Sequence, residues 1–477
     1  MAKKFAFLSL ASVAMSFAAQ AASTIAERAH SALFGYMNRS GLVLGATAFS
    51  QQETVLFDKL MAGFDDGLVV AKQVTVTNLD PVLLERSQGL QFWRPQPYIS
   101  TTVDGPAGTD ISASFADLTQ LSVPLGLGYN KAVPWAMTGN DLNDPMQRDR
   151  KWTSALQALK TQINISCANV AGIYGSLVVK RTVAASGFDD LAAADSVMLE
   201  QGLVGDAVRR VAILHARDYN SMASALAKPQ TSANSKVNPA YEKGFVGDVS
   251  GFDTYKADYT YNLAARAGIT VTVTSANQRY VPKATSTAST GEVQSVDNRF
   301  QTLPITVTSG TVKVGDAFTI AGVNAVHHIT KADTGQLKTF RVTAIVTGAG
   351  GTGTVQITPP IIAADSSPTQ AELEYKNVTA TPASGAAITF LNTVTSNVAP
   401  YFDTRAIELL PGRQGVDEDL VAAGAGTMRA TSELGIEVVL YKWFDIKTKK
   451  FLYRADARWG VGCTNPEMAG IVLFNQT

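Results

Sequence analysis

The spacing of apolar residues predicts one helix that is much longer than any other in the chain, over residues 143–177. Its apolar side chains recur at steps of mostly three and four, which keeps one face of the helix apolar: Trp152, Leu156, Leu159, Ile163, Val170, Ile173 and Leu177. Asn143 or Asp144 can cap its start, Pro145 suits the first helical position, and Gly175 marks its end. At about 1.5 Å per residue the helix is roughly 50 Å long. We expect a spine crossed by other elements, although a coiled-coil strand or a bundle helix fits the same pattern.

Residues 1–75 read as a helical N-terminal arm. The pattern is Ala-rich and helical over 1–46 and amphipathic over 48–75. The first residues also match a secretory signal peptide, with a basic start, an apolar run over 5–17 and the small-residue site Ala19-Gln20-Ala21. We interpret them instead as an apolar helix that packs on its own or a neighbouring subunit, because the rest of the chain lacks the disulfide framework of a small secreted domain.

Residues 76–142 contain a long, two-stranded hairpin. The stretch 90–100 is extended because its two prolines exclude a helix, 103–110 forms the turn, and 115–127 returns with the alternation of a strand. An isolated hairpin is only marginally stable in water. We therefore expect this hairpin to lie on another subunit, unless it belongs to an ordinary sheet.

The remaining chain divides at changes of pattern. Residues 178–267 read as mixed α/β, and the helical pattern then disappears until about residue 396. Short strands with Gly-rich joints over 268–396 predict a small β-barrel or sandwich, inserted at a loop whose ends lie close together. Residues 397–425 resume the mixed domain, and 426–477 are β-rich, with a turn at 448–450 and a closing strand over 469–474.

Charge and length exclude some classes of protein. Forty basic and forty acidic residues give no net charge, so a dedicated nucleic-acid binder, which needs a basic excess, is not indicated. No other apolar run reaches the roughly 18 residues of a membrane-spanning helix. Cys167 and Cys463 have no metal-ligand neighbours, and we expect buried free thiols.

No stretch carries recognisable catalytic chemistry. The Gly-rich run 348–353 lacks the Lys-Ser/Thr ending of a phosphate loop and reads as a hairpin tip. We expect His327 and His328 on a strand, where neighbours face opposite ways and do not share a metal. The acidic run 417–419 reads as a solvated loop, with weak cation binding as the remote alternative. We therefore assign no catalytic, cofactor-binding or metal-binding residue.

Several short motifs, taken in order, resemble one family. They include 251–253, 296–300, 315–323, 340–342 and 354–359 in and before the inserted module, and 458–461, 465–467 and 470–471 near the end. With the order of the predicted elements, they resemble the major capsid proteins of tailed double-stranded DNA bacteriophages, in particular the coat-protein branch of the short-tailed transducing phage of Salmonella. The resemblance covers about residues 48–477, and residues 1–46 extend beyond it.

The resemblance implies an α+β fold of the tailed-phage and herpesvirus type, first described for the Hong Kong ninety-seven phage, with an inserted all-β domain. It makes 76–142 the extended loop, 143–177 the spine helix, 178–267 and 397–425 the axial domain, and 426–477 the strands of the peripheral domain. The loop over 275–295 corresponds in position to one that reaches between capsomers.

The same resemblance implies that copies of the chain form hexamers and pentamers in an icosahedral shell. The expected partners are a scaffolding protein, a portal protein and enclosed double-stranded DNA bound without sequence specificity, with a decoration protein as a further candidate and no membrane. The expected place is the virion, assembled in the host cytoplasm. The alternatives are a secreted or surface-layer protein, suggested by the start of the chain, and an envelope-associated hydrolase, which the missing nucleophile disfavours.

Overall fold

The predicted spine is present as helix α5 (Pro145–Tyr174), capped at its start by the Asp144 side chain with Pro145 in the first turn. The computed structural model of the chain describes residues 49–78, 91–96, 105–106, 110–112, 115, 117–203, 208–227, 243, 246–415 and 426–477. The helix is shorter than the predicted 143–177. Residues 177–180 leave it because they pair in parallel with a strand near the C-terminus.

The apolar face of α5 lies on a long, six-stranded sheet of order β1-β20-β23-β22-β21, with β4 on the other side of β23. Its strands are β1 (Thr75–Val76), β4 (Tyr129–Thr138), β20 (Ile407–Pro411), β21 (Gly426–Thr431), β22 (Glu437–Asp445) and β23 (Lys450–Cys463). Leu156, Leu159 and Ile163 belong to the core formed with this sheet, and the indole of Trp459 donates to Ser166 of α5 at 2.8 Å. Within this chain α5 therefore packs on a sheet, as the spine interpretation requires.

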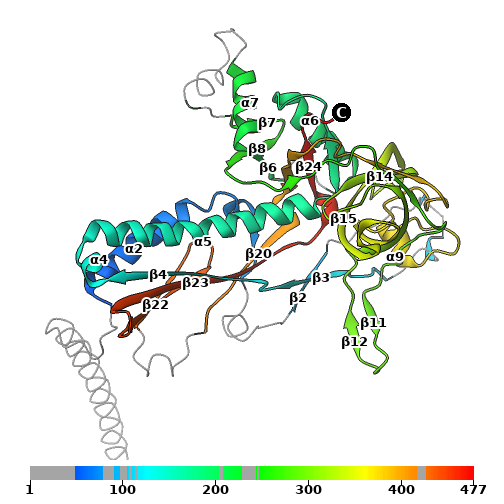
Figure 1. Ribbon diagram of the computed structural model, residues 1–477. Helices are drawn as coiled ribbons and strands as arrows, with labels where there is room; N and C mark the ends of the chain where they lie inside the picture. The colour runs from blue at the N-terminus through cyan, green and yellow to red at the C-terminus, as the bar shows by residue number, and fades with distance from the viewer. Residues whose placement is uncertain are drawn as a thin grey trace, which may run out of the picture.

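A second, mixed sheet lies beyond the C-terminal end of α5 (Figure 1). Its order is β5-β24-β19-β6-β8-β7, formed by β5 (Leu177–Lys180), β24 (Ala469–Leu473), β19 (Ala399–Asp403), β6 (Arg210–His215), β8 (Phe252–Ala257) and β7 (Asp248–Val249). Helices α6 (Phe188–Glu200) and α7 (Ala216–Ala227) pack on its strands.

Two strand assignments from the sequence need correction. The closing strand, expected with the peripheral strands, is β24 of the mixed sheet, between β5 and β19. Residues 407–411, expected in the axial part, are β20 of the long sheet, where they pair with β1 and β23. Both segments lie in a different sheet from the one expected. Their hydrogen-bonding partners are distant in the sequence, and the local pattern of apolar residues does not encode such partners.

The inserted module is a closed barrel of order β10-β13-β16-β15-β14-β17 with a core of its own. Its strands are β10 (Thr270–Val273), β13 (Gln301–Ser309), β14 (Ala317–Val326), β15 (Asp333–Thr347), β16 (Gly353–Thr358) and β17 (Ala387–Phe390). The short pair β9 (Asn262–Leu263) and β18 (Ser396–Asn397) joins the two ends of the insertion. The predicted barrel strands and the proximity of the ends of the insertion are confirmed.

Smaller elements complete the described chain. Two further two-stranded pairs are β2 (Gln91–Pro95) with β3 (Ser122–Gly126), and β11 (Thr285–Thr287) with β12 (Val293–Ser295). The other helices are α2 (Gln51–Asp66), α4 (Gly139–Asn143) and α9 (Gln370–Tyr375), with short 3-10 turns η1 (Ala71–Gln73), η3 (Gly348–Gly350), η4 (Thr404–Ala406) and η5 (Pro466–Met468). The expected helix over 48–75 is therefore α2 followed by a turn. The expected helical segment 1–46 lies outside the described residues.

Candidate assembly surfaces and barrel junction

The barrel caps the spine helix through Arg341 of β15. The guanidinium is fully buried and donates to the carbonyls of Gly172 at 2.7 Å, Gly175 at 3.0 Å and Gly315 at 2.9 Å. Carbonyls at a helix C-terminus lack intrahelical donors and carry the negative end of the helix dipole, so a cation is favourable there. Burial lowers the pKa of Arg341 to about 10, which leaves it charged at neutral pH.

A second polar cluster joins the barrel to η5. The ammonium of Lys338 is buried and donates to Glu467 and, at 2.9 Å, to Gln201. His328 lies with its Nε2 3.4 Å from the Glu467 carboxylate. Burial opposes the charge on Glu467, but Lys338 and His328 hold its pKa well below the ordinary value. Burial lowers the pKa of His328, which keeps it neutral at pH 7.

The two connections of the barrel are tied to each other. The guanidinium of Arg266, on the entering connection, contacts the buried carboxylate of Asp316 at 2.8 Å. Asn392, on the leaving connection, donates to Asp316 at 3.1 Å and to the carbonyl of Ala264 at 2.8 Å. A buried ion pair with its remaining lone pairs satisfied holds one geometry. The barrel is therefore fixed to the body at three polar clusters.

At the end of the molecule away from the barrel, α2 is bonded to strands β22 and β23 of the long sheet. Glu53 of α2 is buried and accepts from Lys442 at 3.0 Å and from the hydroxyl of Tyr453 at 2.7 Å. Burial by itself raises the pKa of Glu53, but the Ser50 amide, Tyr453 and Lys442 together lower it below the ordinary value. The side chain of Ser50 completes a capping box with Glu53.

The hairpin arm is anchored at its base. Arg94 of β2 contacts Glu408 of β20 at 2.8 Å, and Gln96 donates to the carbonyl of Thr464 at 2.7 Å. On the returning strand, the amide of Thr119 donates to Glu374 at 3.0 Å, and the hydroxyl of Tyr375 donates to the carbonyl of Thr119 at 2.8 Å. The arm therefore leaves the molecule beside α9 of the barrel.

Projecting parts of the chain carry exposed apolar side chains. Every side chain of β11 and almost every one of β12 is exposed, and this hairpin stands out from the barrel (Figure 1). Among the residues that the structure describes, the most exposed large apolar side chains are those of Phe115, Ile446, Val55, Val293 and Phe188, between 63% and 79% exposed. Exposed apolar groups at projecting ends are typical of surfaces that other chains cover.

The positions singled out for chemistry lie apart from one another. We expected His327 and His328 on a strand, but this prediction is wrong. They lie in the turn after β14, which the amide of Lys331 closes by donating to the carbonyl of His327. The run 348–353 joins β15 to β16, which confirms the hairpin tip. The predicted loop 417–419 lies outside the described residues.

The described residues hold no group of three or more His, Cys, Asp or Glu side chains placed for a metal ion. In the same residues, no helix combines the length and apolar character needed to cross a bilayer. Cys167 and Cys463 are free and buried, as predicted, and burial raises the pKa of each thiol to about 12.

The polar clusters of the junction were not predicted from the sequence. Lys338, Arg341 and Glu467 read as ordinary charged residues of strands and turns. The one available signal was Phe340-Arg341-Val342, in which a charged residue interrupts an apolar strand. Its two partners on α5 are more than 160 positions away, so the pattern alone does not identify them.

The chain matches one family model and several solved structures. A family model described as "P22 coat protein - gene protein 5" matches residues 45–475. The solved structure "CUS-3 coat protein I-domain" is 41% identical over 27% of this chain and 99% of its own, with a TM-score of 0.21. "Mycobacterium phage Che8" is 10% identical, covering 86% of this chain and 92% of its own, with a TM-score of 0.41. "Capsid structure of the Cyanophage P-SCSP1u" is 11% identical, covering 85% and 87%, with a TM-score of 0.40.

Proposed function

The chain belongs to the P22 coat protein family and is a major capsid protein with the predicted capsid fold, and on that premise we propose how it builds a phage head. The match over residues 45–475 is the observation that carries the function. It replaces the alternative of a secreted or surface-layer protein. The role we propose is purely structural, without catalysis.

We propose that copies of the chain form hexamers and pentamers of one icosahedral shell. The long sheet with α5 serves as the peripheral part, and the mixed sheet with α6 and α7, from residues 178–267 and 397–425, as the axial part at capsomer centres. The chain crosses between the two sheets from β19 to β20 and again from β23 to β24. The charge balance of the whole chain suits a wall that encloses double-stranded DNA without gripping it.

Two projecting hairpins are the proposed connectors between subunits. The arm built on β2 and β3 overlaps a neighbour in the same capsomer, and β11–β12 reaches a neighbouring capsomer. The almost complete exposure of β11 and β12 supports this role, because a two-stranded hairpin gains little stability alone in water. The proposed further partners are a scaffolding protein and a portal, with a decoration protein on the outer surface. Assembly takes place in the host cytoplasm.

Assembly of purified protein tests the proposal. With and without a scaffolding protein, sedimentation and electron microscopy are expected to show closed shells of uniform size. Replacing residues 286–294 with two glycines is expected to leave monomer unfolding unchanged while closed shells give way to open or irregular assemblies. The control replaces Gln336 with glycine at the exposed start of β15, next to the native Gly335, and should leave shells intact. Persistent monomers under every condition would overturn the capsid function.

A further inference from the structure

The β11–β12 hairpin is closed at its base by the side chain of Asn298, which is 5% exposed. The amide oxygen of Asn298 accepts from the Lys283 amide at 3.0 Å and from the Tyr280 hydroxyl at 3.1 Å. Its amide nitrogen donates to the carbonyls of Lys283 and Val296, both at 2.9 Å. These four bonds use the full hydrogen-bonding capacity of an asparagine amide. Because Lys283 and Val296 flank the hairpin on its two sides, Asn298 fixes the direction in which the hairpin leaves the barrel.

The base of the arm is held by α9 and by an apolar cluster. Leu121, just before β3, is 3% exposed and packs with Ile362 and Tyr375 of the barrel. We call these three residues the arm-base cluster. The Tyr375 hydroxyl donates to the carbonyl of Thr119 at 2.8 Å, and the Thr119 amide donates to Glu374 at 3.0 Å. Apolar and polar contacts thus hold the same short stretch of the arm.

The side chain of Tyr280 contacts both bases. Its ring packs against the arm-base cluster, while its hydroxyl donates to Asn298 at the base of the hairpin. Burial raises the pKa of Tyr280 to about 12, so the hydroxyl keeps its proton and remains a donor at neutral pH. A second link is a main-chain bridge that pairs Ser122 of β3 in parallel with Asp297, the residue before Asn298. The two bases are therefore joined by one side chain and by the backbone.

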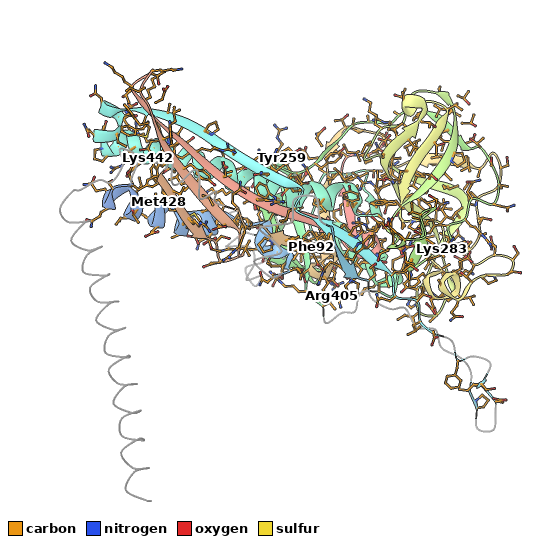
Figure 2. The ribbon with its side chains drawn as sticks, turned by 90° about the horizontal axis from the view of Figure 1, so that it is seen from below. Phe92, Tyr259, Lys283, Arg405, Met428 and Lys442 are labelled. Carbon is orange, nitrogen blue, oxygen red and sulfur yellow. The ribbon has the colours of Figure 1, made fainter. Side chains whose placement is uncertain are left out.

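The figures show how the two bases approach each other. In Figure 1, β3 runs toward the lower part of the barrel, from which β11 and β12 project. In Figure 2, the strand that carries Phe92 leads toward the part of the barrel that carries Lys283.

A cavity of about 40 Å³ lies where the bases meet, and its lining includes Leu121, Asn298 and Arg299. Such a volume holds a few water molecules, whereas ligand pockets measure roughly 300–1,000 Å³. Arg299 pairs with Asp297 at 2.7 Å and donates to the carbonyl of Cys463 at 2.7 Å. The meeting point is therefore a junction between elements and not a ligand site.

We propose that Tyr280 and Asn298 are positioning residues that hold the two connecting hairpins at one fixed angle to each other. In the proposed shell the arm overlaps a neighbour in the same capsomer, and β11–β12 reaches another capsomer. A neighbour that binds one hairpin then meets the other already in place, which avoids the cost of ordering it. The inference rests on the proposed capsid function and adds to it the residues that couple the two connectors.

Distances between spin labels on the two hairpins test the coupling in the unassembled chain. Phe115→Cys on the arm and Val293→Cys on β12 replace side chains that are 79% and 68% exposed, and the native cysteines are buried. Pulsed electron paramagnetic resonance of the labelled chain is expected to give one narrow distribution of distances. Tyr280→Ala should broaden it to roughly twice the parent width, because a segment released from its tertiary contacts samples more orientations.

Two further variants separate the coupling from a general loss of structure. Tyr280→Phe keeps the ring in the arm-base cluster and removes only the bond to Asn298, so we expect a smaller broadening. Tyr259→Ala removes a tyrosine that is 39% exposed after β8 and is labelled in Figure 2, and it should leave the distribution unchanged. Denaturant unfolding of each variant shows that the chain is folded.

Assembly gives the functional readout. Tyr280→Ala is expected to slow shell formation, followed by light scattering, by about threefold to tenfold, because each neighbour must then order a loosened connector. Ser122→Cys with Asp297→Cys, added to Tyr280→Ala and oxidised, joins the bases at their main-chain bridge. This disulfide should restore the rate to within about twofold of the parent, and the same chain in its reduced form is the control and should stay slow.

The outcomes separate this inference from the capsid function. Equal widths in the parent and in folded Tyr280→Ala would overturn the coupling, as would equal assembly rates of the oxidised and reduced chains. If Tyr280→Ala does not fold, Tyr280→Phe decides in its place, and a width equal to that of the parent would overturn the proposal. Absence of shells from the unaltered chain would instead count against the capsid function, since the spin labels measure the coupling without assembly.

Discussion

At the scale of single residues, the unusual feature is a buried arginine that is held by carbonyls. Arg341 donates to three carbonyl groups, two of them at the end of α5. The helix dipole and the unsatisfied carbonyls together take the place of an anion. One side chain of the inserted module thus completes the hydrogen bonding of the longest helix in the body.

Replacing Arg341 is expected to destabilise the whole chain. Arg341→Met leaves three buried carbonyls without donors, and we expect the free energy of unfolding to fall by about 3–5 kcal/mol. Arg341→Lys should recover only part of the loss, since one ammonium does not reproduce the planar fork. Denaturant unfolding measures both. Arg279→Met, at a more exposed barrel arginine that also bonds a carbonyl, is the control, and equal losses at the two sites would contradict the capping role.

The junction also makes stability depend on pH. Glu467 has a folded pKa below its ordinary 4.5, so its contribution is full above pH 4.5 and is lost as the pH falls. His328 has a folded pKa below 6.5, so the unfolded chain takes up a proton first, and stability also falls below pH 6.5. We expect the free energy of unfolding to decline from pH 6.5 and more steeply below 4.5.

Single substitutions show which side chain causes each part of the fall in stability with pH. Glu467→Gln should flatten the decline below pH 4.5, and His328→Asn the decline between 6.5 and 4.5. Unfolding in denaturant at a series of pH values gives the profile. Glu292→Gln, at an exposed carboxylate, should leave it unchanged. An unaltered slope in both junction variants would show that other groups set the acid sensitivity.

At the scale of elements, α2 is joined to the long sheet by buried charge as well as by apolar packing. Phe57, Met61 and Phe64 belong to the core shared with α5, while Glu53 reaches Lys442 and Tyr453 on β22 and β23. Apolar contacts tolerate small rotations, whereas the buried ion pair requires one geometry. The pair therefore sets the position of α2 on the long sheet.

Replacing one partner of the Glu53–Lys442 ion pair should lower the free energy of unfolding more than replacing both partners. Lys442→Met leaves the Glu53 carboxylate buried without its cation, and we expect a loss of about 3–5 kcal/mol. The double variant Glu53→Met with Lys442→Met should be more stable than Lys442→Met alone. Thermal or denaturant unfolding of the two singles and the double measures the coupling. Additive losses would show that the two groups act independently.

At the scale of the whole molecule, the chain consists of a continuous body and a barrel with separate cores. The barrel is attached at the end of the spine through the polar clusters and through a small apolar cluster that contains Ala317 of β14 with Val178 and Ile471 of the mixed sheet. The arm leaves the molecule beside the barrel. This arrangement suits a subunit that must contact different neighbours with the same interior. In the shell that we propose, only projecting elements then have to adapt between hexamers and pentamers.

The separate core predicts independent folding of the barrel. Residues 268–396 expressed alone are expected to unfold cooperatively, because the closed barrel has no unpaired sheet edge and buries its own apolar residues. In that fragment Arg341→Met should change stability by less than about 1 kcal/mol, since the spine carbonyls are absent and water reaches the guanidinium. Circular dichroism during denaturation tests both points, and a fragment without a cooperative transition would contradict the first.

Local pattern was enough to predict most elements, while the resemblance to the coat-protein family came from the order of several short motifs. The three- and four-residue spacing predicted α5, the alternation with Gly-rich joints predicted the barrel strands, and Gly175 marked the helix end correctly. These features depend on neighbours within a few residues, which is the range over which period and capping act. The isolation of Cys167 and Cys463 from metal-ligand neighbours likewise predicted free buried thiols.

Only the tertiary structure decided what depends on distant partners. It placed β20 in the long sheet and β24 in the mixed sheet, and it ended the spine helix before residues 177–180, which pair with β24. It also placed the Arg341 guanidinium beside carbonyls that are 166 and 169 positions away. It also buried the Arg148 guanidinium of α5 beside α2, within 3.4 Å of the Gln52 side chain. A sequence records which side chains are charged, but the burial that makes a charge need a partner arises only when remote segments pack together.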